Sequence, residues 1–163
     1  MNTTRATILL VLLGLLAACV AGPGASTTPT LGTVTTLRVE RAIPNAGITM
    51  SPPTTQIAAI QAKDALAVCT SGVASCPDGP AAAELAIATD SGSGRVDAAG
   101  KMTLLMNHKL VWALSWSDVQ CTHSGPPPLP GASPAPRFTA CDVVAFVDAN
   151  TGAFLYTLSY AHQ

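Results

Sequence analysis

The amino-acid sequence predicts an α+β fold, with one main helix packed on an antiparallel β-sheet. Three observations support this class. Residues 54–69 are rich in alanine and have high helix propensity. Residues 109–117 alternate between two faces, and residues 142–160 have the pattern of a strand, a tight turn and a second strand. An N-terminal signal segment and a flexible tether are predicted ahead of this domain.

The start of the chain has the composition of an export signal. Arg5 is the only charge in the first seven residues, and residues 8–16 are apolar apart from Gly14. Residues 6–21 are uncharged, but at about 1.5 Å per residue they extend over only about 24 Å, against about 30 Å of hydrocarbon. This stretch is therefore short for a membrane-spanning helix.

The apolar run ends with Leu-Ala-Ala-Cys at residues 16–19. This stretch resembles the lipobox of bacterial lipoproteins. The resemblance implies that Cys19 carries fatty acid, such as palmitate, and becomes the first residue of the mature protein. Residues 1–18 are then the signal peptide, and the lipid holds the chain on the extracytoplasmic face of the cell membrane. An ordinary secretory signal is the alternative, although no Ala-x-Ala pair lies before Pro23.

The number of cysteines agrees with acylation of Cys19. The chain has five cysteines, and lipid on Cys19 leaves four for an oxidising compartment. Three pairings of these four cysteines are open. The shortest loops are closed by disulfides from Cys69 to Cys76 and from Cys121 to Cys141. Loop closure would stabilise the folded protein by about 2.5 kcal/mol for the first disulfide and about 3.3 kcal/mol for the second. Four buried thiols, or a zinc site that includes Cys121 and His123, are the alternatives.

Length and charge limit the function classes. The 145 residues after the signal suffice for one ordinary domain. The formal net charge of the whole chain is −1, and its eight basic residues are scattered. This distribution excludes an electrostatic surface for nucleic acid.

The chain after the signal divides into a tether and a folded part. Residues 19–36 are predicted to be a lipidated cysteine and a flexible tether, because Gly, Pro, Ser, Thr and Ala dominate them. Residues 37–163 are predicted to form the single α+β domain, with a first strand near residues 33–43. Ser51 and the two prolines after it predict the start of the helix at residues 54–69.

Strands are predicted next at residues 84–89, 101–106 and 109–117. In the last of these, Leu110, Trp112, Leu114 and Trp116 share one face, which predicts a buried strand. The tryptophans are expected to pack in the core, with a ligand shelf as the alternative. Residues 125–136 contain six prolines and are predicted to be an irregular excursion. A hairpin turning at Asp148 to Gly152 closes the chain.

The helix, the tryptophan strand and the closing Val-Asp-Ala-Asn-Thr-Gly-Ala-Phe-Leu at residues 147–155 resemble the PepSY domain, a small α+β module of bacterial cell-envelope proteins. The likeness covers residues 52–160. It implies a module that binds or restrains peptidases without catalysis. The proline-rich excursion and the cysteine pairs depart from the family.

The sequence offers few residues for chemistry. It has two glutamates, most of its seven aspartates lie in or beside predicted turns, and no G-x-S-x-G or P-loop is present. His108, His123 and His162 have no partner at a spacing typical of a metal site or a catalytic triad. We therefore expect neither a cofactor nor catalysis.

The sequence thus predicts a lipid-anchored envelope lipoprotein that acts as a binding module, toward a peptidase or another envelope protein. The expected binding surface is the C-terminal hairpin with the proline-rich loop, and its candidate residues are Trp112, Trp116, Tyr156 and Tyr160. Two other functions stay open. One is a small hydrolase whose Ser, His and Asp meet only in the folded protein, and the other is a structural envelope component.

Overall fold

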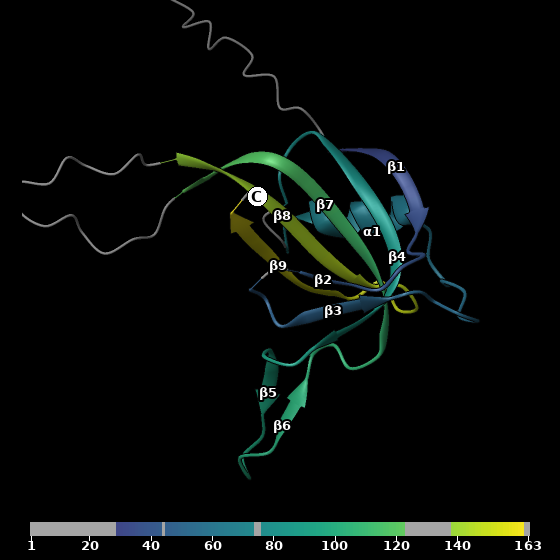
Figure 1. Ribbon diagram of the computed structural model, residues 1–163, viewed down its shortest axis with the longest axis vertical. Coiled ribbons are helices and arrows are strands. Elements are labelled where there is room, and N and C mark those ends of the chain that lie inside the picture. The colour runs from purple at the N-terminus through teal and green to yellow at the C-terminus, as the bar shows by residue number, and fades with distance from the viewer. Residues whose placement is uncertain (1–28, 44, 74–75, 123–137, 162–163) are drawn as a thin grey trace, which may run out of the picture.

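The computed structural model describes residues 29–43, 45–73, 76–122 and 138–161. These residues form one curled sheet, a separate small hairpin and one short helix (Figure 1). The elements are, in chain order, β1 (Thr30–Thr36), β2 (Arg41–Ile43), β3 (Ile48–Ser51), α1 (Ala62–Val68) with a π-helical turn at Cys69–Val73, β4 (Pro80–Asp90), β5 (Gly94–Val96), β6 (Met102–Leu104), β7 (Lys109–Thr122), β8 (Phe138–Asp148) and β9 (Phe154–Ala161).

The main sheet has the order β2-β3-β4-β7-β8-β9, and its neighbours are antiparallel. β1 and β3 share one edge of β4. β1 pairs in parallel with residues 80–85, whereas β3 pairs with residues 87–90. Residues of β2 and β3 belong to the same buried cluster as residues of β7, β8 and β9, so the sheet curls into a half-barrel.

β7 shows why the sheet has two buried faces. Leu110, Trp112, Leu114 and Trp116 lie in a cluster on the side of α1, which we call the α1-side cluster. Val111 and Ala113, which alternate with them, lie in the cluster inside the curl, which we call the inner cluster. The predicted alternation of β7 is therefore confirmed, and the strand is longer than the nine residues expected because its pairing with β8 continues to Thr122.

The predicted fold class is wrong. The chain is mostly β-sheet curled into a half-barrel, and there is no main helix over residues 54–69 packed on a sheet. α1 has only seven residues. Ala59 and Ile60 donate their backbone N–H groups to the carbonyl of Ala149, at 2.9 and 3.1 Å. These long-range bonds hold residues 59 and 60 against the β8–β9 turn, and such tertiary contacts outweigh intrinsic helix propensity.

The first strand, β1, begins earlier in the chain than the sequence predicted. β1 begins at Thr30, within the stretch expected to be flexible through residue 36. The small and polar residues of this stretch suggest a tether, but β1 obtains its backbone partners from β4. Gly32 suits this pairing, because a Cβ atom there would lie 3.3 Å from the carbonyl oxygen of Ala81. Residues 1–28, which contain the predicted signal and Cys19, lie outside the described residues.

The predicted disulfide bonding is confirmed. Cys69 pairs with Cys76, and Cys121 pairs with Cys141, with Cα atoms 5.8 and 5.9 Å apart. These pairs close the two shortest loops among the three pairings. The first ties the turn after α1 to the segment that leads into β4, and the second joins β7 to β8.

The closing hairpin forms as predicted. β8 and β9 pair antiparallel on either side of the turn from Asp148 to Gly152. Gly152 has φ +74°, a conformation that side-chain-bearing residues rarely adopt, and its N–H donates to the Asp148 carbonyl at 2.9 Å. Among the described residues, no helix has the length and apolar character needed to cross a membrane.

Candidate functional site

An apolar groove of about 600 Å³ lies on the α1 side of the sheet. β1 forms one wall through Leu31 and Val34, and the start of α1 with residues 53–61 forms the other. Leu85 of β4 and Trp112 of β7 also line it. Ligand sites of this size, lined mainly by apolar side chains, are typical of small-molecule and peptide recognition.

Hydrogen bonds hold one wall of the groove in place. The Trp112 indole N–H donates to the Ile60 carbonyl at 3.0 Å, so the wall is joined to β7. The bonds from Ala59 and Ile60 to Ala149 join the same segment to the β8–β9 turn. The wall that contains Ala59 and Ile60 is therefore fixed to both β7 and the β8–β9 turn.

Apolar groups in the groove are open to solvent. Ile57 is 88% exposed and Val34 is 49% exposed, although both are large hydrophobic residues that would otherwise be expected to be buried. Exposed apolar groups that adjoin a cavity commonly mark an interaction site. Of the four aromatic residues predicted from the sequence to bind, Trp112 lines this groove. The two walls were not predicted from the sequence, because they come from segments that were expected to be a tether and a helix.

The described part of the chain places few polar groups in the groove, and only one of them is charged. These groups are Thr36, Gln56, Gln61 and Lys63, and none of the described lining residues is an aspartate or a glutamate. The nearby Asp64 is engaged in capping α1, since its carboxylate accepts from the Gln61 N–H at 3.2 Å. The groove therefore favours an apolar ligand that carries no positive charge beside Lys63.

The four candidate aromatic residues lie on two different faces of the sheet, and the tryptophans pack in the core as expected. Trp112 and Trp116 are 7% and 2% exposed and lie in the α1-side cluster. Tyr156 and Tyr160 are half-buried and pack against the inner cluster, which lies on the other face of the sheet. The alternation of strand residues separates the two pairs. The proline-rich loop that was expected to complete this surface lies outside the described residues.

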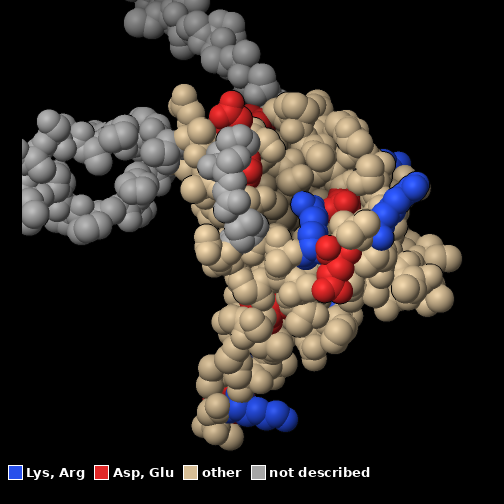
Figure 2. Space-filling view, viewed as in Figure 1, with Lys and Arg blue, Asp and Glu red and all other residues tan. Residues whose placement is uncertain are grey.

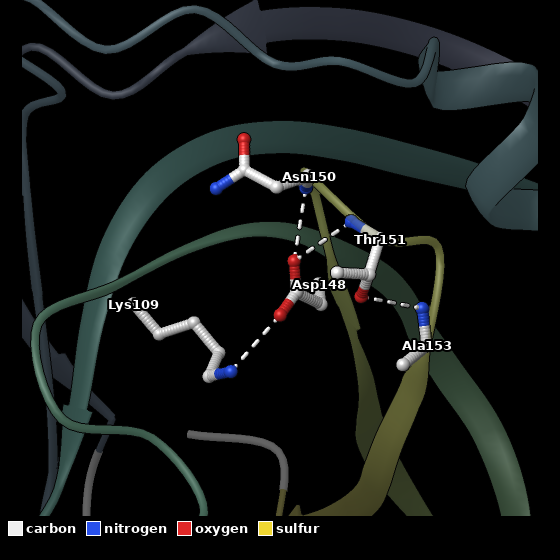
Figure 3. Close-up of polar contacts among 5 residues, drawn as sticks. All are labelled: Lys109, Asp148, Asn150, Thr151 and Ala153. Atoms are coloured by element: carbon white, nitrogen blue, oxygen red, sulfur yellow. Dashed lines mark hydrogen bonds and ion pairs between the residues drawn. The ribbon is translucent and has the colours of Figure 1, made fainter.

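Two buried aspartates have the same structural role. Asp148 Oδ1 accepts the N–H groups of Asn150 and Thr151 at 2.9 and 3.0 Å, and its Oδ2 accepts from Lys109 Nζ at 2.9 Å (Figure 3). Asp90 Oδ1 likewise accepts the N–H groups of Gly92 and Ser93 at 2.8 and 3.0 Å. In each case one carboxylate oxygen organises a turn.

The second oxygen of Asp90 has a distant partner. Asp90 Oδ2 accepts a hydrogen bond from the Tyr156 hydroxyl, which joins the end of β4 to β9 across the inner cluster. Burial alone would raise the pKa of Asp90, but bonds from Tyr156, Ser93 and Gly92 bring it below its ordinary value. Burial first, and then the hydrogen bond to Asp90 and the charge of Asp90, raise the pKa of Tyr156.

Acid is expected to destabilise the protein through these two carboxylates. Burial would raise the pKa of Asp148 as well, but bonds from Lys109, Asn150 and Thr151 bring it below 3.8, the ordinary value for both groups. A carboxylate whose pKa is lowered by folding stabilises the protein above its unfolded value, and this stabilisation is lost as the pH falls through the folded value.

Urea unfolding from about pH 6 to about pH 2 would measure this effect. The free energy of unfolding should stay level above pH 3.8 and fall below it. The double variant Asp90→Asn and Asp148→Asn should be less stable at neutral pH and show a flatter acid limb. An unchanged acid limb in that variant would contradict the assignment.

The described residues hold no group of three or more His, Cys, Asp or Glu side chains that could bind a metal ion. Cys121 is bonded to Cys141, which removes it from the zinc site that was the weaker alternative. His108 lies in the exposed reversal before β7, and its N–H donates to the Thr89 hydroxyl at 3.1 Å. His123 and His162 lie outside the described residues.

A smaller cavity of about 230 Å³ opens beside the inner cluster. Its polar lining includes Arg41, Ser115, Asp142 and Tyr160. Burial and the Asp142 charge raise the pKa of Tyr160, and Arg41 partly offsets this rise. Arg41 is also paired with Glu84. Figure 2 draws one face of the molecule. Charged side chains occupy only a few places on that face, and most of its surface is uncharged.

No family model, curated protein or solved structure matches the chain.

Proposed function

We propose that this protein is a lipoprotein of the cell envelope that acts as a non-catalytic binding module, with the apolar groove between β1 and α1 as its site. Lipid on Cys19 would hold it on the extracytoplasmic face of the membrane. The groove is the observation that carries the proposal, because it combines a cavity of about 600 Å³ with apolar groups exposed at its edge.

The position of the groove in the chain suits a tethered receptor. Leu31 lines the groove and lies only twelve positions after Cys19. A fully extended chain of that length spans at most about 40 to 43 Å. Acylation of Cys19 would therefore keep the groove close to the membrane surface, where it meets ligands of the envelope.

The roles of the buried carboxylates support a non-catalytic module. Asp90 and Asp148 each use one oxygen to hold a turn and the other to bind a side chain of a second strand. The hydrolase alternative gains no support from the part of the chain that the structure describes, because His108 is exposed and its imidazole has no hydrogen bond there to a serine or an aspartate. The peptidase partner implied by the PepSY likeness stays a prediction.

The test of the proposal is binding of the apolar fluorescent probe bis-ANS to the chain from Val20 onward. Every described element lies within residues 29–161, and both buried clusters consist of residues 31 and later, so starting the chain at Val20 removes no residue of a described element or cluster. We expect binding at one site. Val34→Asp should weaken it by about tenfold or more, because the new carboxylate must be desolvated in an apolar groove.

The matched control is Val96→Asp on β5. Val96 is 65% exposed, so the same chemical change is made on another exposed valine that does not line the groove. It should leave the affinity for bis-ANS unchanged. Equal loss in both variants, or no loss in Val34→Asp, would refute the groove as the binding site. Incorporation of labelled palmitate that Cys19→Ser abolishes would test the membrane anchor separately.

A further inference from the structure

We propose that the groove receives an extended peptide segment of another protein, which adds as a strand to the free edge of β1 and places alternate apolar side chains in the groove. This inference rests on the proposed function and names the ligand class. The backbone of β1 and the lining of the groove support it independently.

β1 has an edge available for pairing. It pairs with β4 along one side only, and no other described strand pairs with it. Six of its seven residues are exposed, and Leu31 is half-buried. The N–H and C=O groups on the outer side of such a strand are a template for another strand, which is the basis of peptide recognition by strand addition.

The groove adjoins this edge. Leu31 and Val34 of β1 lie on one wall, and Ile57 and Ala58 on the other. A strand added to β1 would direct every second side chain toward the α1 side of the sheet, where the groove lies. Main-chain hydrogen bonds would then supply affinity, and the groove would select apolar residues at alternate positions.

Charge adds a further feature of the ligand. Among the residues that the structure describes, Lys63 is the only charged one that lines the groove, and it is exposed. No described aspartate or glutamate lines the groove, and the neighbouring Asp64 accepts a hydrogen bond from the Gln61 N–H at the start of α1. An acidic residue beside the apolar positions would therefore pair favourably with Lys63, with the modest strength of an exposed ion pair.

The other sheet edges are less suited to this role. β2 has three residues, and its Arg41 is paired with Glu84. β9 has eight residues, but the cavity beside it is lined by a mixture that includes Gln120, Thr157 and Ser159. Only β1 combines an unpaired edge with a mainly apolar groove among the described strands. A fatty acyl chain would fill the groove but would make no use of the backbone edge.

The test uses a fluorescein-labelled peptide, Thr-Val-Thr-Val-Thr-Val-Asp, and the chain from Val20 onward. Two further peptides carry N-methyl groups on all valines or on all internal threonines. Because alternate N–H groups of a strand point to opposite edges, only one methylated peptide loses the bonds to β1. In anisotropy titrations we expect the parent peptide to bind, one methylated peptide to bind at least about tenfold more weakly, and the other within about threefold of the parent.

Two variants complete the experiment. Val34→Asp should weaken binding of the parent peptide, and Val96→Asp should not, because Val96 does not line the groove. Equal binding of the two methylated peptides would overturn strand addition. The parent peptide could fail to bind while bis-ANS or cis-parinaric acid binds and Val34→Asp weakens that binding. In that case the groove binds an apolar chain, so strand addition is refuted and the groove remains the binding site. If none of these probes binds, the proposed function fails with it.

Discussion

Replacing Asp148 with alanine is expected to lower the free energy of unfolding by about 3 kcal/mol. The change removes two hydrogen bonds that hold the β8–β9 turn, and it removes the partner of Lys109, which is 35% exposed. Bonds to a charged group contribute about 1.5 to 3 kcal/mol each, and we discount the ion pair because water screens Lys109. Urea unfolding followed by circular dichroism measures the difference.

Asp97 is a matched control for this prediction. It holds the turn between β5 and β6 in a similar way, since its Oδ1 accepts the N–H groups of Ala99 and Lys101, both at 2.9 Å. Asp97 is exposed, and its hairpin forms a separate two-stranded sheet. Asp97→Ala should therefore lower the free energy of unfolding by about 1 kcal/mol or less. A loss as large as that of Asp148→Ala would show that burial and Lys109 contribute nothing.

Removing the disulfide between Cys121 and Cys141 is expected to lower the free energy of unfolding by about 3.3 kcal/mol. Removing the one between Cys69 and Cys76 should lower it by about 2.5 kcal/mol. The first bond joins cysteines 20 positions apart and the second joins cysteines 7 positions apart, so the first restricts the unfolded chain more. Urea unfolding of the two double Cys→Ala variants measures both losses.

Reduction supplies the control for the disulfide prediction. Dithiothreitol should destabilise the unaltered protein by more than it destabilises either double variant, because each variant keeps one bond. It should have no effect when all four cysteines are replaced. A protein whose stability does not respond to reductant would contradict the contribution of both bonds.

Local signals in the sequence predicted several elements correctly. The Asp148-to-Gly152 turn forms because the aspartate satisfies the turn N–H groups and the glycine takes a positive φ, and both requirements are visible in the sequence. The alternation of β7 likewise places its even-numbered and odd-numbered residues on opposite faces. The spacing of the cysteines favoured the pairs that the structure shows.

Elements that depend on distant partners were not predicted. Residues 54–61 have helix-forming composition. Hydrogen bonds that their backbone donates to the Ala149 carbonyl and accepts from the Trp112 indole N–H fix the chain near Ile60 in another conformation. β1 is a strand because β4 pairs with it, and its composition alone suggested a tether. The groove lies between these two misjudged segments, so it could not be found before the fold was known.

The most direct test of the groove as the binding site is methyl-resolved NMR of the chain from Val20 onward, titrated with bis-ANS. The account predicts that shifts concentrate on methyl groups lining the groove, such as those of Leu31, Val34, Ile60 and Leu85, while Val96 and Met102 on the β5–β6 hairpin stay unchanged. Shifts that concentrate on the hairpin, or on Ile43 and Val144 beside the smaller cavity, would contradict it.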